Sequence, residues 1–304
     1  MLLTYAVNDR LQGGKMGNIN KVILEHACRI AGEVGAKAVL LYAAVADDLP
    51  IVDDPGICMN IILVTKGDEE IPEKFKNCGL LIHVPNVNLT RVGQVKIAIT
   101  KGIAMGLFTQ GDKLVCVSGV PRFGYVDSIF IVDVGKEFEI LVSGNFGDMA
   151  QGVYPEVFGA VMNLALELAA QGREGRKVGT IFVLGDHEKV MQLSRQMIIN
   201  PFMGYTDEQR NILNPDLKET IKEFSAIDGS FIVKDNGTIV TAGRHLSAAM
   251  DSRDFPQGLG SRHIAAAGIT SITDAIAVVL SESTGNVSVF KTGKILVSIE
   301  KPID

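Results

Sequence analysis

The sequence predicts an α/β protein of two domains: a mostly parallel α/β sandwich, followed by an α+β domain with a mixed, twisted sheet. The length of 304 residues suits two domains better than one. Over the first half, helix-like and strand-like segments alternate, which is typical of a parallel sheet with helices on both faces. The last third carries short apolar runs joined by tight turns, which is typical of antiparallel strands.

The elements of the first domain follow from the spacing of its apolar residues. Residues 18–35 have helical spacing, with Asn20 as the N-cap and Gly35 at the end of the helix. Residues 91–108 also have helical spacing and predict a second helix. Short apolar runs predict buried strands over residues 36–44, 57–66, 78–86, 112–120 and 128–135.

A change of pattern near residue 148 predicts the boundary between the domains. Between residues 141 and 157, glycines, a proline and Tyr154 interrupt both the helical and the strand periodicity. The first domain is therefore predicted over residues 1–147 and the second over residues 148–304.

The second domain is expected to begin with a long helix over residues 154–172, ended by Gly172. A strand over 176–186 and a helix over 187–197 follow. Residues 230–243 are two apolar runs joined by Asp-Asn-Gly, which predicts a hairpin. A further helix is expected to begin at Arg262, with Ser261 as its N-cap. Residues 275–300 hold three strand-like runs and predict an antiparallel meander.

Charge and apolar pattern exclude several classes of protein. The formal net charge is −6, so no nucleic-acid partner is expected, although a single phosphate site needs only a few local donors. No uncharged window reaches 18 apolar residues, so no membrane partner is expected either. The N-terminus has no apolar signal region, and the four cysteines form no Cys-x-x-Cys pair. We interpret the cysteines as free thiols and the protein as cytoplasmic.

The familiar nucleotide and hydrolase motifs are absent from the sequence. The segment FKTGK is not a Walker A loop, because Ser288 stands where a glycine is needed and Ile295 where Ser or Thr is needed. No Gly-x-Gly-x-x-Gly follows a predicted strand, and neither His-Glu-x-x-His nor Gly-x-Ser-x-Gly occurs.

One segment predicts an anion site by its local chemistry. Gly258 and Gly260 flank a leucine, and Ser261, Arg262 and His263 follow at the expected start of a helix. Such a start offers free backbone N–H groups and the positive end of the helix dipole. Arginine adds a planar charge that suits phosphate, and histidine donates or binds a metal. The alternative is a capped helix whose arginine and histidine lie on the surface.

Two further segments supply polar groups that phosphoryl chemistry needs. Asp228 and Gly229 precede a predicted strand, where a carboxylate is available to a metal or an attacking hydroxyl. Ser281, Glu282 and Ser283 follow the strand after the anion segment, and polar groups at strand ends often line a site. Taken singly, Asp-Gly is more often a turn, and the Ser-Glu-Ser residues are more often solvated.

In this order, the three segments resemble the diadenylate cyclase domain, a family that makes cyclic di-AMP from two ATP molecules. The family hallmarks are Asp-Gly-Ala, Arg-His-Arg and Ser-Glu-Glu. They stand here as Asp228-Gly229-Ser230, Arg262-His263-Ile264 and Ser281-Glu282-Ser283. The likeness spans roughly the last 130 residues, and the whole chain looks like the archaeal type.

The resemblance implies a role for each matching residue. Asp228 would lie by the ribose hydroxyl, Gly260 and Ser261 would hold phosphates, and the backbone of Leu246 would read adenine. The implied catalytic residues are Asp228, Arg262 and His263, and the implied metal ligands are Asp228 and His263. The implied ATP-binding residues are Gly229, Ser230, Leu246, Gly258, Gly260, Ser261, Arg262, His263, Ser281 and Glu282.

Four positions depart from the family pattern. Ser230 replaces alanine and Ser261 replaces threonine, which are mild changes. Ile264 replaces the second arginine and Ser283 replaces glutamate, so the triphosphate contacts are in doubt. A second Arg-His pair, at residues 244 and 245, has no glycines before it, and we expect its charges at the pocket rim or in solvent.

The resemblance also implies a cofactor and a partner. Nucleotidyl transfer of this kind uses a divalent cation, Mn²⁺ or Mg²⁺, and two subunits that face each other with one ATP each. The first domain resembles the C-terminal regulatory domain of pyruvate kinases, on its strand pattern and the Gly-Asp-x-Leu-Val run at residues 111–115. The alternative function is a regulatory protein that senses adenine nucleotides without chemistry.

Overall fold

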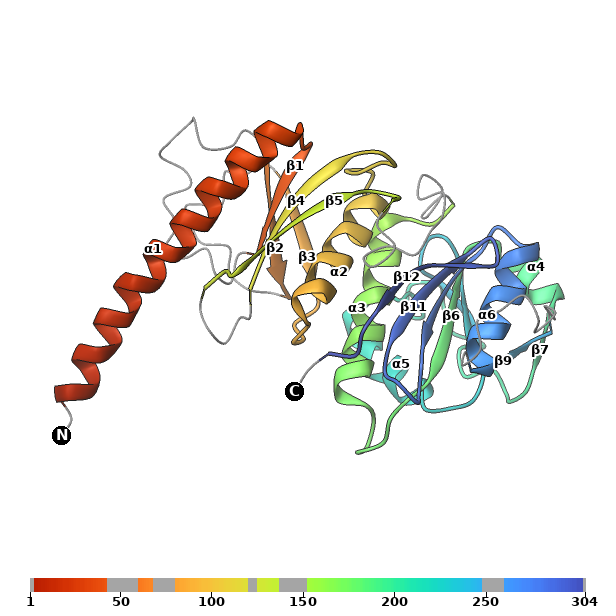
Figure 1. The fold of residues 1–304 in the computed structure, drawn as a ribbon. Coiled ribbons are helices and arrows are strands. Elements are labelled where there is room, and N and C mark those ends of the chain that lie inside the picture. Colours follow the sequence, from red (N-terminus) through yellow and green to blue (C-terminus); the bar gives the residue numbers. More distant parts are fainter. Residues whose placement is uncertain are drawn as a thin grey trace. The chain divides into compact units, whose positions relative to one another are not determined.

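The computed structural model describes residues 3–42, 60–67, 80–119, 125–136, 152–247 and 260–302, with side chains from residue 19 onward. The chain divides into two compact units (Figure 1). The first comprises residues 1–86, 90–98 and 111–134, and the second comprises residues 87–89, 99–110 and 135–304. The predicted domain boundary at residue 147 lies outside the described residues and stays a prediction.

The first unit is built on a five-stranded sheet of order β3-β2-β1-β4-β5. The first four strands in that order are parallel and β5 is antiparallel to β4, so the sheet is mostly parallel, as predicted. Each predicted strand is present over a shorter range of residues than predicted. The strands are β1 (Ala38–Tyr42), β2 (Ile61–Lys66), β3 (Leu81–Val84), β4 (Lys113–Ser118) and β5 (Ser128–Asp133).

Helix α1 (Leu3–Val34) packs against β1 and β4, and α2 (Arg91–Ala104) is the second predicted helix. Asn20 is not an N-cap, because α1 begins much earlier and the buried Asn20 side chain accepts a hydrogen bond from the Val126 N–H at 2.8 Å. Gly35 ends α1 as predicted, with a φ of +64°. The expectation of free thiols holds for Cys116 and is wrong for Cys28, which is disulfide-bonded.

The second unit is built on a seven-stranded sheet of order β12-β11-β10-β6-β8-β9-β7. Strands β6 and β8 are parallel and the other neighbours are antiparallel, so the predicted mixed sheet is confirmed. The hairpin and the meander are present where the turn residues predict them. The strands are β6 (Thr180–Leu184), β7 (Ser194–Gln196), β8 (Ser230–Val233), β9 (Ile239–Leu246), β10 (Ile276–Leu280), β11 (Val287–Lys291) and β12 (Lys294–Ile299).

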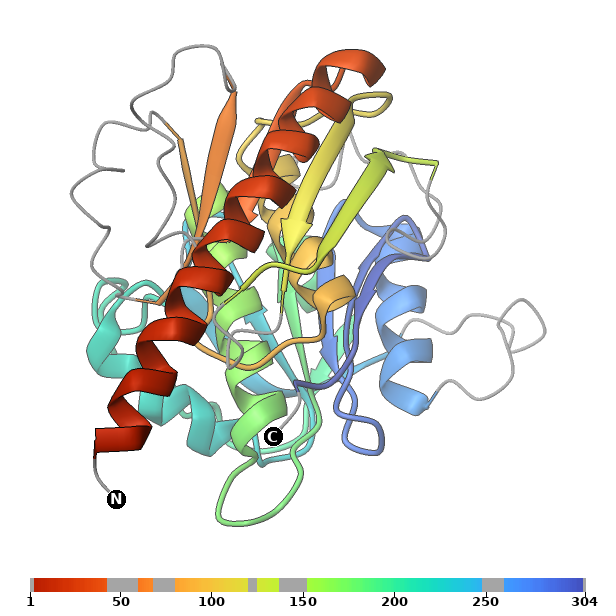
Figure 2. The ribbon, with the colours of Figure 1, turned by 60° about the vertical axis from the view of Figure 1, so that its left-hand side comes forward.

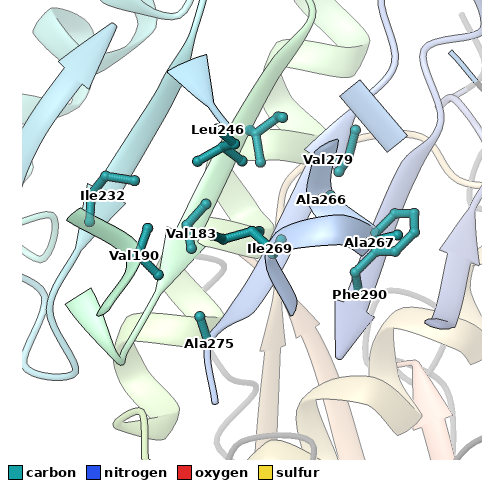
Figure 3. Close-up of a cluster of buried hydrophobic side chains, with 12 residues drawn as sticks. Val183, Val190, Ile232, Leu246, Ala266, Ala267, Ile269, Ala275, Val279 and Phe290 are labelled. Carbon is teal, nitrogen blue, oxygen red and sulfur yellow. The ribbon is translucent and has the colours of Figure 1, made fainter. Parts of the chain in front are cut away.

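Helices α3 (Pro155–Gln171) and α6 (Ser261–Ile272) lie on opposite faces of this sheet (Figures 1 and 2). Figure 3 shows the core under α6, where Ala267 and Ile269 meet Val183 and Phe290. The sheet residues of this core alternate along β6 and β10, as the strand period of two requires. The core therefore fixes the rotation of α6 about its axis, and with it the direction of the side chains at its first turn.

The remaining helices are short. The predicted helix over residues 187–197 ends early: α4 covers His187–Gln192, and β7 follows as an edge strand. Pairing of β7 with β9 supplies backbone hydrogen bonds that the local helical pattern did not anticipate. The 3₁₀ helix η5 (Pro215–Leu217) and α5 (Lys218–Phe224) were not predicted. Within the described residues, no helix is long and apolar enough to cross a membrane.

Candidate nucleotide site at the start of α6

One edge of the seven-stranded sheet gathers the predicted motifs. Strands β6 and β8 run parallel and both begin at this edge, whereas the antiparallel β10 ends there. Asp228 and Gly229 precede β8, and Ser281 and Glu282 follow β10, so these two segments lie on either side of the start of β6. The site lies at the amino ends of the parallel pair, not at the carboxyl ends that open α/β sheets usually offer to ligands.

Arg262 joins the three motifs. Its Nη1 donates to Glu282 Oε2 at 3.0 Å, and its Nη2 donates to Asp228 Oδ1 at 3.2 Å. The arginine side chain is 27% exposed, whereas the carboxylates are 92% exposed for Asp228 and 55% for Glu282. The fork of the guanidinium thus holds two accessible carboxylates in fixed positions at the sheet edge.

Gly179 belongs to this arrangement, although no motif pointed to it. It is buried immediately before β6. A Cβ atom there would lie 2.7 Å from Glu282 Cβ and 2.9 Å from Arg262 Nη1. Only a residue without a side chain lets the arginine and the glutamate meet above the start of β6. The sequence signal was a glycine directly before a buried strand, which is too common to single out.

Two hollows adjoin Arg262. The basic pocket has a volume of about 620 Å³ and mixes cations with hydroxyl groups. It is lined by Arg176, Lys177, Gly260, Ser261, Arg262, His263, Ser281, Glu282 and Ser283. Of these, Arg176 and Lys177 were not predicted. They stand in the segment GREGRK between α3 and β6, where a basic run after a helix is typical of an ordinary surface turn.

The mixed pocket lies on the other side of Arg262, with a volume of about 440 Å³. Apolar walls and polar groups both face it. It is lined by Ile181, Met197, Asp228, Gly229, Ser230, Arg244, His245, Leu246, Ser261, Arg262, Ala265 and Glu282. The two pockets share Ser261, Arg262 and Glu282, so one continuous surface can accept a ligand with an anionic part and an apolar part.

The first turn of α6 differs from the prediction by one residue. Gly260 is the N-cap and Ser261 is the first helical residue, so the expected capping by the Ser261 side chain is wrong. The Gly260 carbonyl accepts hydrogen bonds from the N–H groups of His263 at 3.0 Å and Ile264 at 3.2 Å. The N–H groups of Ser261 and Arg262, at the start of the helix, have no intrahelical acceptor and can donate to an anion. Gly258 lies outside the described residues.

His263 is 7% exposed and faces the basic pocket. Its ring packs edge-on against Phe290, with centroids 5.8 Å apart. Burial lowers the pKa of the imidazole below its ordinary value, so the neutral ring is favoured near pH 7. A neutral imidazole can donate one hydrogen bond to a phosphate or use its other nitrogen as an acceptor or metal ligand.

The predicted metal pair stays a prediction. Within the part of the chain that the structure describes, no group of three or more His, Cys, Asp or Glu side chains converges on a possible cation position. An exposed carboxylate such as that of Asp228 nevertheless matches the way Mg²⁺ binds to nucleotide enzymes, through one or two carboxylates, substrate phosphates and water.

The backbone behind the mixed pocket is tightly packed. Gly229 has a φ of +114°, and a Cβ there would lie 2.7 Å from the carbonyl carbon of Gly243. Ser230 is buried, and Leu246 is buried at the wall of the pocket. Close packing of strand β9 against Gly229 therefore fixes the position of Asp228, the preceding residue along the chain.

The second Arg-His pair requires a correction. Arg244 lines the mixed pocket, which agrees with the expected position at the rim, but it is only 8% exposed, so the alternative of a solvated arginine is wrong. Its guanidinium donates to Ser194 Oγ at 2.8 Å and to the Met191 carbonyl at 2.9 Å. Pairing of β9 with β7 places these acceptors beside it, which the sequence pattern did not reveal. His245 is exposed, as expected.

Ser281 combines a turn with the pocket wall. Its Oγ accepts a hydrogen bond from the Thr284 N–H at 3.3 Å, and its N–H donates to the Asn286 carbonyl at 2.9 Å. The hydroxyl also lies 3.2 Å from Ser283 Oγ, and both serines line the basic pocket. The turn interpretation and the pocket interpretation of this segment therefore both hold.

Two family models match this chain. The family model described as "DisA bacterial checkpoint controller nucleotide-binding" matches residues 167–295, which include every predicted site residue. The model described as "Probable sensor domain DacZ_P" matches residues 20–141. Neither match bears on the likeness of the first domain to pyruvate kinase, which stays a prediction.

Curated relatives extend the similarity over most of the chain. A diadenylate cyclase of Haloferax volcanii is 34% identical over 231 residues, which cover 75% of this chain and 83% of the relative. A diadenylate cyclase of Methanocaldococcus jannaschii is 39% identical over 203 residues, which cover 66% of this chain and 64% of the relative. The cyclic di-AMP synthase CdaA of Bacillus subtilis is 42% identical over 66 residues, or 22% of this chain and 23% of the relative.

Proposed function

The chain belongs to the diadenylate cyclase family of nucleotidyltransferases, and from this premise we propose that it condenses two ATP molecules into cyclic di-AMP and two pyrophosphates. The observation that carries the proposal is the shared wall of the two pockets. Arg262 and Glu282 stand between a pocket with cations and hydroxyls and a pocket with apolar walls and Asp228. A nucleotide needs both environments side by side.

The triphosphate of ATP would lie in the basic pocket and the adenosine in the mixed pocket. Both volumes fall within the range of about 300 to 1,000 Å³ that is usual for small-molecule sites. The backbone N–H groups at the start of α6, the Ser261 hydroxyl and the neutral His263 ring would donate to phosphate oxygens. Leu246 and Ala265 would cover the base, with adenine read by the backbone at Leu246.

The chemical step is attack of a ribose 3′-hydroxyl on the α-phosphorus of a second ATP. A bond forms between the 3′-oxygen and phosphorus, and the bond from phosphorus to the oxygen that bridges to the β-phosphate breaks. Pyrophosphate leaves with that electron pair. Asp228 would orient the hydroxyl and accept its proton. Arg262 holds Asp228 Oδ1 at 3.2 Å, which keeps the carboxylate at the boundary of the two pockets.

Both attacks require a second subunit. One nucleotide fills the two pockets of one chain, so the hydroxyl and the phosphorus that react must belong to nucleotides on different subunits. Two facing sites with antiparallel nucleotides would bring each hydroxyl to the opposite α-phosphate. We therefore propose self-association into at least a dimer during turnover.

A divalent cation, Mn²⁺ or Mg²⁺, would complete the site, held by Asp228 and the phosphates of ATP. Its chemistry would be neutralisation of the triphosphate and of the leaving pyrophosphate. The exposure of the Asp228 carboxylate supports this assignment, because such ions retain several water ligands. His263 is buried beside Phe290, and we assign it to a phosphate oxygen first and to the cation second.

The test is incubation of the purified chain with ATP and either Mn²⁺ or Mg²⁺, followed by mass spectrometry. The expected product has the mass of two AMP minus two waters, and EDTA should abolish it. The matched variant Asp228→Asn should bind ATP by calorimetry and form no product. Tight ATP binding by the parent chain without product would instead support the alternative, a nucleotide-sensing regulator, which the replacements at Ile264 and Ser283 motivate.

We further propose that residues 1–147 form a separate regulatory domain of the kind found at the C-terminus of pyruvate kinases. Its support is the mostly parallel five-stranded sheet with its own order of strands. Separate expression of residues 1–147 and 148–304 tests the boundary. A second fragment that unfolds cooperatively and still forms cyclic di-AMP is the expected result.

A further inference from the structure

The basic pocket contains two cations that the motifs do not include, Arg176 and Lys177. We propose that these two residues bind the β- and γ-phosphates of ATP and supply the positive charge that the family motif would place at residue 264. The inference rests on the proposed function, because it takes ATP as the ligand. It adds two specific binding residues that neither the motifs nor the resemblance assigns.

The residues of the predicted site carry too little positive charge to bind a triphosphate. Arg262 is bonded to both Asp228 and Glu282, so its single positive charge meets two negative ones. Position 264 is isoleucine. An ATP triphosphate carries several negative charges, and these residues alone would repel it rather than attract it.

Arg176 and Lys177 add two positive charges to the basic pocket. Both line the basic pocket together with Ser261 and Ser283. Within the described residues, neither side chain makes an ion pair with a carboxylate. Among the described residues, no carboxylate neutralises these two charges, so they are available to an anion. Ser283, where the family has a glutamate, removes a negative charge from the same wall and acts in the same direction.

The backbone holds Arg176 in a tight turn. Arg173 and Arg176 exchange backbone hydrogen bonds of 2.9 and 2.8 Å. The two residues between them, Glu174 and Gly175, have φ values of +49° and +73°, as a type I′ turn requires. A Cβ on Gly172 would lie 2.3 Å from the Arg176 carbonyl oxygen, so the chain is closely packed here. The turn thus fixes the backbone position of Arg176 at the wall of the basic pocket.

The side chain of Lys177 makes one hydrogen bond to the opposite segment of the pocket wall. Its Nζ donates to the Ser283 carbonyl at 3.3 Å, which spans from the segment before β6 to the turn after β10. This bond uses one of the three ammonium donors and leaves the others for a ligand. Lys177 is exposed, and this bond holds its ammonium group beside Ser283 at the wall of the basic pocket.

A purely structural role is the competing explanation. The two cations follow the C-terminus of α3, where positive charge is favoured by the helix dipole. If the role is structural, removing the two cations should lower the stability of the fold and weaken the binding of all ligands equally. If the two cations bind phosphates, removing them should weaken the binding of ATP, which has three phosphates, more than that of AMP, which has one. The two explanations therefore predict different affinities for ATP and AMP.

The experiment uses the full chain with Arg176→Gln and Lys177→Gln combined, and titrates ATP and AMP in the presence of Mg²⁺ by calorimetry. We expect the dissociation constant for ATP to rise about 100-fold, roughly tenfold for each charge-assisted hydrogen bond that is removed, and that for AMP to change less than about twofold. The matched control combines Lys189→Gln with Lys294→Gln, which removes the same charge from exposed residues that line neither pocket. It should bind both nucleotides like the parent.

The conservative double variant, Arg176→Lys with Lys177→Arg, should retain most of the ATP affinity. Unchanged ATP affinity in the Gln variant, or an equal weakening for ATP and AMP, overturns this inference and leaves the proposed function intact. A parent chain that binds no ATP overturns the proposed function and this inference together.

Discussion

Gly179→Ala is expected to impair the cyclase reaction more than it destabilises the fold. Gly179 lies under the contact between Arg262 and Glu282, and a Cβ there would be 2.7 Å from Glu282 Cβ and 2.9 Å from Arg262 Nη1. The end of the arginine side chain can move aside at little cost. Glu282 Cβ is fixed to the backbone and cannot move without the turn after β10.

The size of the effect follows from these distances. Ordinary contacts begin at 3.4 Å, so Glu282 Cβ must move by about 0.7 Å, the difference between 3.4 and 2.7 Å. Overpacking of this kind costs about 1–3 kcal/mol of unfolding free energy. A displacement approaching 1 Å at a reacting site costs up to about 100-fold in rate, and we expect a decrease of roughly 10- to 100-fold in kcat/KM.

The assay is the initial rate of cyclic di-AMP formation from ATP, with urea unfolding of the same samples. The control is Gly32→Ala, since Gly32 lies on the exposed side of α1 and a Cβ there meets nothing within 4 Å. This control should retain full activity and gain up to about 1 kcal/mol from helix propensity. If Gly179→Ala turns over ATP with the parent's kcat and KM, the idea that this glycine positions Arg262 and Glu282 is wrong.

Three further outcomes are expected. Arg262→Ala should weaken ATP binding by at least about tenfold in calorimetry, because it removes a charged donor and leaves two carboxylates beside the phosphates; unchanged affinity would remove Arg262 from the site. Gly229→Ala should lower the unfolding free energy by about 2–4 kcal/mol in urea, from strain at a φ of +114° and the clash with Gly243, and a parent-like midpoint would contradict this. Because burial places the pKa of His263 below 6.5, the unfolded chain binds more protons, so stability should fall as the pH drops through about 6.5; His263→Asn should flatten this dependence, and an identical pH profile would count against it.

The sequence predicted most of the fold because its signals are local. Short apolar runs marked most strands of both sheets, and glycines marked the ends of helices at Gly35 and Gly172, where the structure has positive φ angles. The errors occurred where a distant partner decided the outcome. Residues 194–196 form a strand because β9 lies beside them. The Asn20 side chain does not cap a helix but accepts a hydrogen bond from the N–H of Val126, 106 residues away.

The sequence by itself determined which residue types the site contains and in what order, because Asp-Gly, Arg-His and Ser-Glu are contiguous motifs. Only the tertiary structure decided that Arg262 bonds to Glu282 and to Asp228, which are 20 and 34 positions away along the chain. It also added Gly179, Arg176 and Lys177 to the site. None of the three stands in a motif. They reach the site because β6 pairs with β8 and β10, and strand pairing between distant segments is not encoded in local spacing.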